Sequence, residues 1–420
     1  MLRQASSARF PRLPPRLRSP LRFLFLGTSM FVAIPSCGAI RFAAMLLIAA
    51  SSSEGVVFGA EKSSAAPQNV VSAPPQPYSW TDVDVAAWAY CFCPSARLLE
   101  SERRALGAQL KEKNKQQRAM IGLIQAVSAE LALHQRNEAA ADALLVYYRA
   151  VATEWLLEPL RRSAPPLEVL EGLAAATAEL EGSVAGEGHL LENQRLQLED
   201  RWFQLDFGRR RLGHQLEGLV TAQRTLIDPP MILTSPLPVA YDQPLDFPFL
   251  LEGALHDRRD LAALRAMHRC LNEDSLPAVR QLLAGLVPGL GNSLPSRPGL
   301  SLLQHHGGDE SADLAQRRAQ VQQLIETRER QIHDQVRDAI LRLESAQARR
   351  SVAQQQWQVQ VAHAAKLRHA TDLQQLLPGA ADKEELAALQ AEGEWILQQQ
   401  EVAEAVVQLR RACGRGKLVD

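Results

Sequence analysis

Small and apolar residues recur every seven positions along one long stretch of this chain, from Ala312 to Leu377. The stretch has no proline before Pro378 and no glycine before Gly379. One row of the pattern consists of Ile325, Ile332, Ala339, Ala346 and Ala353, and a second row consists of Val336, Leu343, Trp357 and Ala364, interrupted by Arg350. Residues at this spacing form one stripe on a helix and suit coiled-coil packing. The pattern therefore predicts a helix roughly 100 Å long, at about 1.5 Å per residue.

Helical patterns also cover most of the remaining chain. The other predicted helices are Trp80 to Ala89, Ala96 to Glu158, Leu167 to Leu226, Phe249 to Leu286 and Asp382 to Cys413. Thr81 suits the cap of the first helix, and Pro94 suits the first turn of the second. The glycines at Gly182, Gly186 and Gly188 soften the third helix, and a break is expected in the fourth near Asn272 to Ser275.

Prolines divide these helices into two halves. Pro159, Pro165 and Pro166 end the second helix, and six prolines between residues 227 and 249 exclude a regular element there. Pro378-Gly379 predicts a tight reversal between the last two helices. We therefore predict an all-α fold, an elongated antiparallel bundle of long helices in two halves. The predicted divisions are a leader (1–60), a linker rich in Pro, Ser and Ala (61–79), a first helical repeat (80–226), a crossing segment (227–249), a second helical repeat (250–414) and a tail (415–420).

Composition agrees with long helices and narrows the function. Hydrophobic residues make up 46% of the 420 residues but aromatic residues only 5%, which is typical of helical rods more than of sheets. The formal net charge is −1, so no overall basic field points to nucleic acid.

The first 60 residues differ from the rest. They hold seven arginines against one acid, Glu54, and two apolar runs follow the early arginines. A basic start, an apolar core and a small-residue end are typical of an export signal. Its removal would change the formal net charge from −1 to −7, because seven positive charges and one negative charge leave. A retained membrane anchor is one alternative, and an imperfect lipobox at Ile34 to Cys37 is another.

No catalytic, cofactor or metal constellation is recognisable, so we predict that the chain is not an enzyme. The five cysteines lack the spacing of a disulfide framework or a zinc site and read as small apolar fillers, although a bridge to Cys270 stays open. His305-His306 on a polar loop and Arg209-Arg210-Arg211 on a helix read as solvated groups. Tyr148 and Trp155 share a helix face and read as packing groups.

A short internal match hints at duplication. Arg103-Arg104-Ala105-Leu106 aligns with Arg258-Arg259-Asp260-Leu261, each near the start of a helical half. We interpret Arg258 and Asp260 as residues that cap and orient a helix start, where exposed backbone amides favour an acid. Arg258, Arg259, Asp260 and Leu261 are the candidate site, with a structural role as a repeat-entry motif.

These residues also carry a resemblance to a known family. The run Ala254 to Leu261, after the proline-rich segment with Pro244-Leu245-Asp246, resembles the Ala-Leu, two residues, Arg-Pro-Asp-Leu entry to the second repeat of the outer membrane efflux protein (TolC-like) family. Arg259 stands where proline is usual. The helix Glu329 to Arg350 and the final helix ending at Gly414 add to the likeness, which spans about Trp80 to Gly414.

The resemblance implies a transport function without covalent chemistry. It implies self-association as a trimer, a hollow helical conduit in the cell envelope (outer membrane or periplasm) of a Gram-negative-type bacterium, and contact with a periplasmic adaptor and an inner-membrane pump. The alternating strands of a membrane hairpin are not evident in either half, and the only room in the second half is Leu271 to Ser311. The alternative is therefore a periplasmic coiled-coil scaffold or adaptor-like protein with no pore.

Overall fold

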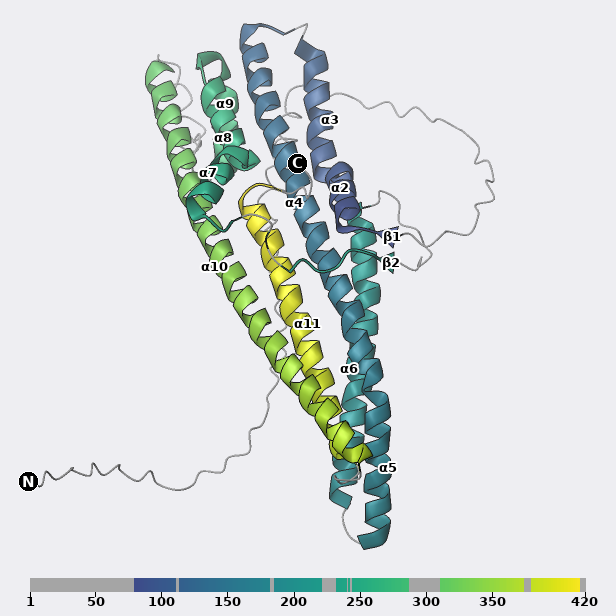
Figure 1. Ribbon diagram of the computed structural model, residues 1–420. Coiled ribbons are helices and arrows are strands. Elements are labelled where there is room, and N and C mark those ends of the chain that lie inside the picture. The colour runs from purple at the N-terminus through teal and green to yellow at the C-terminus, as the bar shows by residue number, and fades with distance from the viewer. Residues whose placement is uncertain are drawn as a thin grey trace, which may run out of the picture.

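The computed structural model is an elongated molecule of long helices that lie side by side (Figure 1). It describes residues 79–110, 113–181, 185–220, 232–239, 241, 244–286, 310–373 and 379–415. Apart from one pair of two-residue strands, the regular elements of these residues are helices, which confirms the predicted fold class. None of the described helices combines the length and the apolar character that a membrane span requires.

Two sets of elements follow one another along the chain. The first set is β1 (Ser79–Trp80), α2 (Asp82–Phe92), α3 (Pro94–Gln109), α4 (Lys115–Arg162), α5 (Ala164–Glu181) and α6 (Ala185–Val220). The second set is β2 (Ile232–Leu233), α7 (Phe247–Asp257), α8 (Arg259–Cys270), the 3-10 turn η2 (Glu273–Ser275), α9 (Leu276–Leu286), α10 (Glu310–Asp372) and α11 (Ala380–Ala412).

Local sequence explains several helix starts. The Thr81 hydroxyl accepts a hydrogen bond from the Asp84 backbone N–H at 3.1 Å and so caps α2. Asn114 and Gln117 form a reciprocal capping box at the start of α4. Pro94 occupies the first turn of α3, where its missing N–H costs nothing.

The longest helices form one layer. α10 packs on α11, α11 packs on α4, and α4 packs on α6 (Figure 1). Two large apolar clusters fill these contacts, one around α4, α8, α10 and α11 and the other around α2, α4, α6 and α11. Buried alanines such as Ala140, Ala339 and Ala403 let the helices approach closely, as the seven-residue rows predict.

A small parallel strand pair fastens the crossing segment to this layer. β1 pairs with β2 so that Trp80 lies opposite Leu233. The hydroxyl of the fully buried Tyr147 donates to the Trp80 carbonyl at 2.9 Å, and that of Tyr148 donates to Asp82 Oδ2 at 2.9 Å. Tyr148 is thus a packing group, as predicted, and it also holds the start of α2.

The first half is more broken than the sequence predicts. The expected helix Ala96 to Glu158 consists of α3 and α4, because the Asn114 capping box starts a new helix. Pro159 does not end α4, which continues to Arg162. The expected helix Leu167 to Leu226 is wrong as a single rod, since α5 ends at Glu181 and α6 runs back beside it. Gly186 and Gly188 lie inside the start of α6, and Gly182 lies outside the described residues.

Duplication is visible in the helix bounds, but in another register. The bounds of α7 lie 165 residues after those of α2, from 82 to 247 and from 92 to 257. A single residue then joins each helix to the next, Cys93 in the first half and Arg258 in the second. The predicted alignment of Arg103 with Arg258 is therefore wrong, because Arg103 lies inside α3, on its exposed side. The predicted alignment followed four similar residues, whereas the two halves correspond at the single residue that separates two helices in each.

The last helix begins at a left-handed glycine. Gly379 precedes α11 with φ of 84°, and a side chain added there would lie 2.8 Å from Leu173 Cδ1 of α5. The reversal predicted at Pro378-Gly379 thus depends on a backbone conformation that other residues adopt at a cost. Pro378 itself lies outside the described residues.

We expect Gly379→Ala to destabilise the fold by about 1 to 3 kcal/mol, because alanine disfavours a positive φ. Urea unfolding followed by circular dichroism at 222 nm measures the change. The matched control is Gly172→Ala in α5, where the added methyl meets nothing within 4 Å and favours the helix. Equal effects of the two substitutions would contradict the role of Gly379.

Candidate functional site

The predicted site residues lie at the junction of α7 and α8. Arg258 is the single residue between the two helices, with extended backbone angles (φ −65°, ψ 112°). Asp260 and Leu261 lie in the first turn of α8. Arg258 and Asp260 therefore both lie at the start of a helix. Arg258 makes no side-chain cap bond, however, and its guanidinium points into the protein.

Arg258 and Asp260 form a buried ion pair with two parallel hydrogen bonds. Arg258 Nε donates to Asp260 Oδ1 at 3.0 Å, and Arg258 Nη2 donates to Asp260 Oδ2 at 2.7 Å. The side chains are only 7% and 13% exposed. A paired fork of this kind is the strong geometry for an arginine and a carboxylate.

Other helices complete the hydrogen bonding of this pair. Arg258 Nη1 donates to Gln335 Oε1 of α10 at 2.9 Å and to the Ala412 carbonyl of α11 at 3.2 Å. Arg328 of α10 donates to Asp260 Oδ2 through Nε at 2.8 Å and also through Nη2. The Arg258–Asp260 ion pair thus connects the α7–α8 junction to both α10 and α11.

The surroundings of Asp260 keep it ionised. Burial alone would raise the pKa of this carboxyl, but the hydrogen bonds and charge of Arg258, together with the charge of Arg328, hold the pKa well below its usual range. Asp260 therefore stabilises the fold at neutral pH, and this contribution is lost as the pH falls below about 4 and toward its lowered pKa.

Gly414 closes the junction from the end of α11. Its φ is 77°, and a side chain added there would lie 3.0 Å from the Cα and N atoms of Arg258. Asn137 Nδ2 of α4 donates to the Gly414 carbonyl at 2.9 Å. Sequence reasoning treated Gly414 only as a helix stop. The close approach to Arg258 left no signal in the local sequence.

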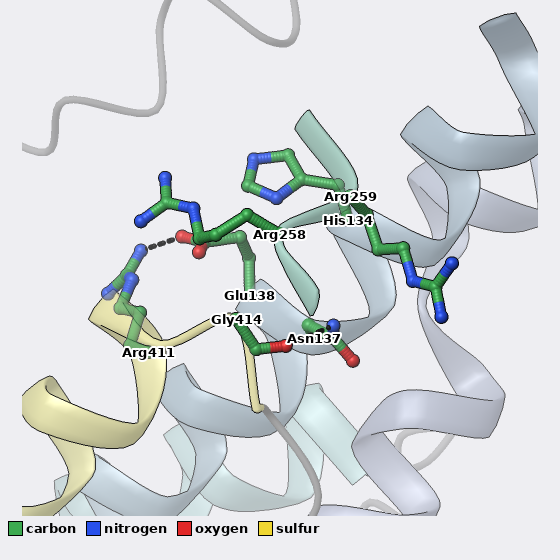
Figure 2. A pocket seen from close by; sticks show the side chains of 7 residues that line it. All are labelled: His134, Asn137, Glu138, Arg258, Arg259, Arg411 and Gly414. Carbon is green, nitrogen blue, oxygen red and sulfur yellow. Dashed lines mark hydrogen bonds and ion pairs between the residues drawn. The ribbon is translucent and has the colours of Figure 1, made fainter. Parts of the chain in front are cut away.

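A small polar cavity of about 10 Å³ lies beside this junction, large enough for about one water molecule (Figure 2). Its lining residues are His134, Asn137, Glu138, Arg258, Arg259, Arg411 and Gly414. Arg411 is bound to Glu138 across the cavity. Burial lowers the pKa of His134, which favours its neutral form near neutral pH. The cavity is too small for a substrate, so the junction is a structural lock.

Arg259 and Leu261 have different environments. Arg259 is the first residue of α8, the position at which proline is favoured, and its side chain runs away from Glu138 (Figure 2). It forms a partly exposed ion pair with Glu130 of α4 at 3.3 Å. Leu261 is fully buried in the apolar cluster shared by α4, α8, α10 and α11.

The described residues hold no group of three or more His, Cys, Asp or Glu that could bind a metal ion. Cys91, Cys93, Cys270 and Cys413 are all free, so no bridge to Cys270 forms. His305-His306, Cys37 and residues 287–309 of the stretch Leu271 to Ser311 lie outside the described residues.

α6 and α10, the outer helices of the layer, each carry a row of exposed apolar side chains, called here an unfilled apolar row. On α6, Leu196, Phe203 and Phe207 are 51%, 64% and 69% exposed; on α10, Leu341, Val352 and Val359 are 55%, 54% and 66% exposed. Residues seven or eleven apart return to the same face of a helix. Each row therefore lies on one face, and at about 100° per residue that face is opposite the one that packs into the layer.

Comparisons with known proteins identify the fold. No family model and no curated sequence matches the chain. Among solved structures, the Campylobacter jejuni CmeC outer membrane channel aligns with a TM-score of 0.60 and 10% identity, covering 86% of this chain and 94% of that chain. The chain has the fold of the TolC-like outer membrane efflux channels.

Two further outer membrane proteins of known structure support the same assignment. The open state of the Neisseria gonorrhoeae MtrE outer membrane channel aligns with a TM-score of 0.55 at 12% identity, covering 86% of this chain and 98% of that chain. VceC, an outer membrane protein of Vibrio cholerae, aligns with a TM-score of 0.52 at 14% identity, covering 79% and 95%. The resemblance inferred from sequence is thus confirmed for the TolC-like fold. The first two of these neighbours are described as outer membrane channels and the third as an outer membrane protein.

We expect Asp260→Asn to destabilise the fold by about 3 to 5 kcal/mol at pH 7, because it leaves the buried Arg258 without its counter-charge. The gap to the natural chain should shrink at pH 3, where Asp260 loses part of its own contribution. Urea unfolding at both pH values measures this.

The matched control for this experiment is Asp246→Asn. Asp246 precedes α7, is exposed and makes no side-chain cap bond, so little change is expected. A natural chain and an Asp260→Asn variant of equal stability at pH 7 would rule out the ion pair as a lock.

Proposed function

We propose that the chain is a TolC-like component of an export or efflux assembly, in which copies join edge to edge and their long helices line a conduit. The observation that carries this proposal is the pair of unfilled apolar rows on α6 and α10, at the two outer edges of the helix layer. The TolC-like fold supports it, because the solved neighbours are described as outer membrane channels.

A helix at the edge of a finished bundle needs only one apolar face. α10 has two, because Ile332, Val336 and Leu343 are buried on one face while Val352 and Val359 are exposed on the opposite one. A helix with two opposite apolar faces suits the middle of a wall that continues on both sides. In a solid bundle of one chain, the second apolar face of α10 would stay exposed to water.

The two edges differ in chemistry, which constrains how copies join. The α6 row contains two phenylalanines and one leucine, whereas the α10 row is wholly aliphatic. An α6 edge that meets an α10 edge gives a head-to-tail contact. Such contacts close into a ring when the rotation between copies allows it. The number of copies, three if the resemblance holds, is part of the proposal.

Transport in this arrangement needs no covalent step. Solutes would pass along the axis of the ring, and the assembly would meet a periplasmic adaptor and an inner-membrane pump. The arginine-rich start of residues 1–60 supports export to the cell envelope, in the outer membrane or the periplasm. No nucleic acid or cofactor has a part in this function.

The second candidate is a periplasmic scaffold or adaptor-like protein without a pore. The hydrogen-bonded lock at Arg258 and the close helix packing would serve a rigid spacer equally well. Planar-bilayer recordings on the purified full-length chain separate the two functions. Stable stepwise conductance supports the conduit, and an assembled protein that never conducts favours the scaffold.

We expect Val352→Glu with Val359→Glu to weaken self-association about tenfold or more, because the charges would have to lose water at an apolar contact. Both residues are exposed in a single copy, so folding should be retained. Sedimentation velocity over a range of concentrations measures the association.

The control is Leu98→Glu on α3, which is equally exposed at 56% but lies outside the two edges. It should leave association unchanged. A natural chain that stays monomeric at every concentration would overturn the conduit.

A further inference from the structure

Two phenylalanines on α6 are unusually exposed for their size. Phe203 and Phe207 lie one turn apart on the free face of the helix and are 64% and 69% exposed. Trp202 packs edge-on against Phe203 with ring centroids 5.3 Å apart, which limits the freedom of that ring. The pair therefore forms a preformed aromatic ridge at one edge of the layer.

A groove lies at the other edge of the layer. It has a volume of about 420 Å³, lies between α10 and α11, and is lined mainly by apolar surface. Its lining residues are Ala348, Arg349, Val352, Ala353, Gln356, Glu394, Leu397 and Gln398. Val352 belongs both to the groove and to the free row of α10, so the groove opens beside that edge.

The ridge and the groove lie at the same height along the molecule. Neighbouring residues of α4 contact both places: the charge of Arg209 of α6 acts on Glu154, and Leu156 Cδ2 lies 3.8 Å from where a side chain on Gly393 of α11 would begin. Trp395 of α11 stacks on Trp357 of α10 with ring centroids 4.8 Å apart. Copies related by rotation about an axis along the helices meet at equal heights, so the ridge of one copy faces the groove of the next.

Charge is complementary at the same place. Arg211 follows Phe207 by one turn on α6 and is exposed, while Glu394 lines the groove and is exposed. Neither has an ion-pair partner among the residues that the structure describes. The side-chain oxygen of Gln398 in the groove is also buried without a hydrogen-bond partner there, and an arginine is a suitable donor.

On this basis we propose that Phe203 and Phe207 of one copy insert into the α10–α11 groove of the next copy and set the register of the ring. The inference rests on the proposed function, because it requires edge-to-edge assembly, and it names the residues that lock the edges. Each phenylalanine is about two thirds exposed, so insertion would remove up to about two thirds of the roughly 150 to 250 Å² that a fully buried aromatic side chain withdraws from water. Arg211 would pair with Glu394 at the rim of the groove.

Cysteine crosslinking in the full-length chain tests the register. In a Cys91→Ser background, which removes an exposed thiol, Phe207→Cys is combined with Val352→Cys. The two sites lie on opposite edges of one copy, so mild oxidation should link different copies. We expect dimers and a closed higher species on non-reducing gels.

The matched control combines Phe207→Cys with Leu341→Cys. Leu341 lies in the same exposed row of α10 but about 16 Å from Val352 along the helix, at about 1.5 Å per residue. It should not crosslink. Sedimentation velocity on the natural chain is run in parallel, and Phe207→Gln should lower association about tenfold or more.

The outcomes separate the two proposals. Assembly with crosslinking at Val352 alone supports the aromatic lock. Assembly with crosslinking at Leu341, or at neither site, overturns the lock and leaves the conduit standing. A chain that does not assemble at all overturns both.

Discussion

The fold depends on one buried ion pair, between Arg258 and Asp260. Five hydrogen-bond donors on a planar guanidinium allow Arg258 to bind Asp260, Gln335 and the Ala412 carbonyl at once, and Arg328 binds the same carboxylate. Short helices and long helices meet at this point. Because an unpaired charge is costly in the interior, the pair forces α7, α8, α10 and α11 into one arrangement.

The apolar clusters between the long helices extend this arrangement into a layer. α10, α11, α4 and α6 lie side by side in this order, so α6 and α10 are the edges of the layer. Apolar side chains therefore lie in two places, inside the layer and on its two edge helices. The apolar side chains on the edges are stabilised only when another surface covers them. This requirement links the packing of one chain to the assembly that we propose.

Local signals in the sequence found the parts that depend on local chemistry. The Thr81 cap, the start at Pro94, the break near Asn272 and the reversal before α11 each follow from residues next to one another in the chain. The reversal of chain direction between α5 and α6 was not predicted, because a glycine-containing stretch is compatible both with a weakened helix and with the end of one. The partners of Arg258 could not be predicted either, since Gln335 and Ala412 reach it only through the packing of distant helices. The alignment of the two halves was also wrong, because it paired Arg258 with Arg103, which lies inside α3.

The position of Gly414 has a consequence for the order in which the molecule is made. Arg258 needs the Ala412 carbonyl and the close approach of Gly414, more than 150 residues later in the chain. During synthesis α7 and α8 emerge long before α11, so the guanidinium must wait in water or with temporary partners. The layer can reach its final order only after α11 arrives, and an earlier halt leaves a chain whose central charge is incompletely bound.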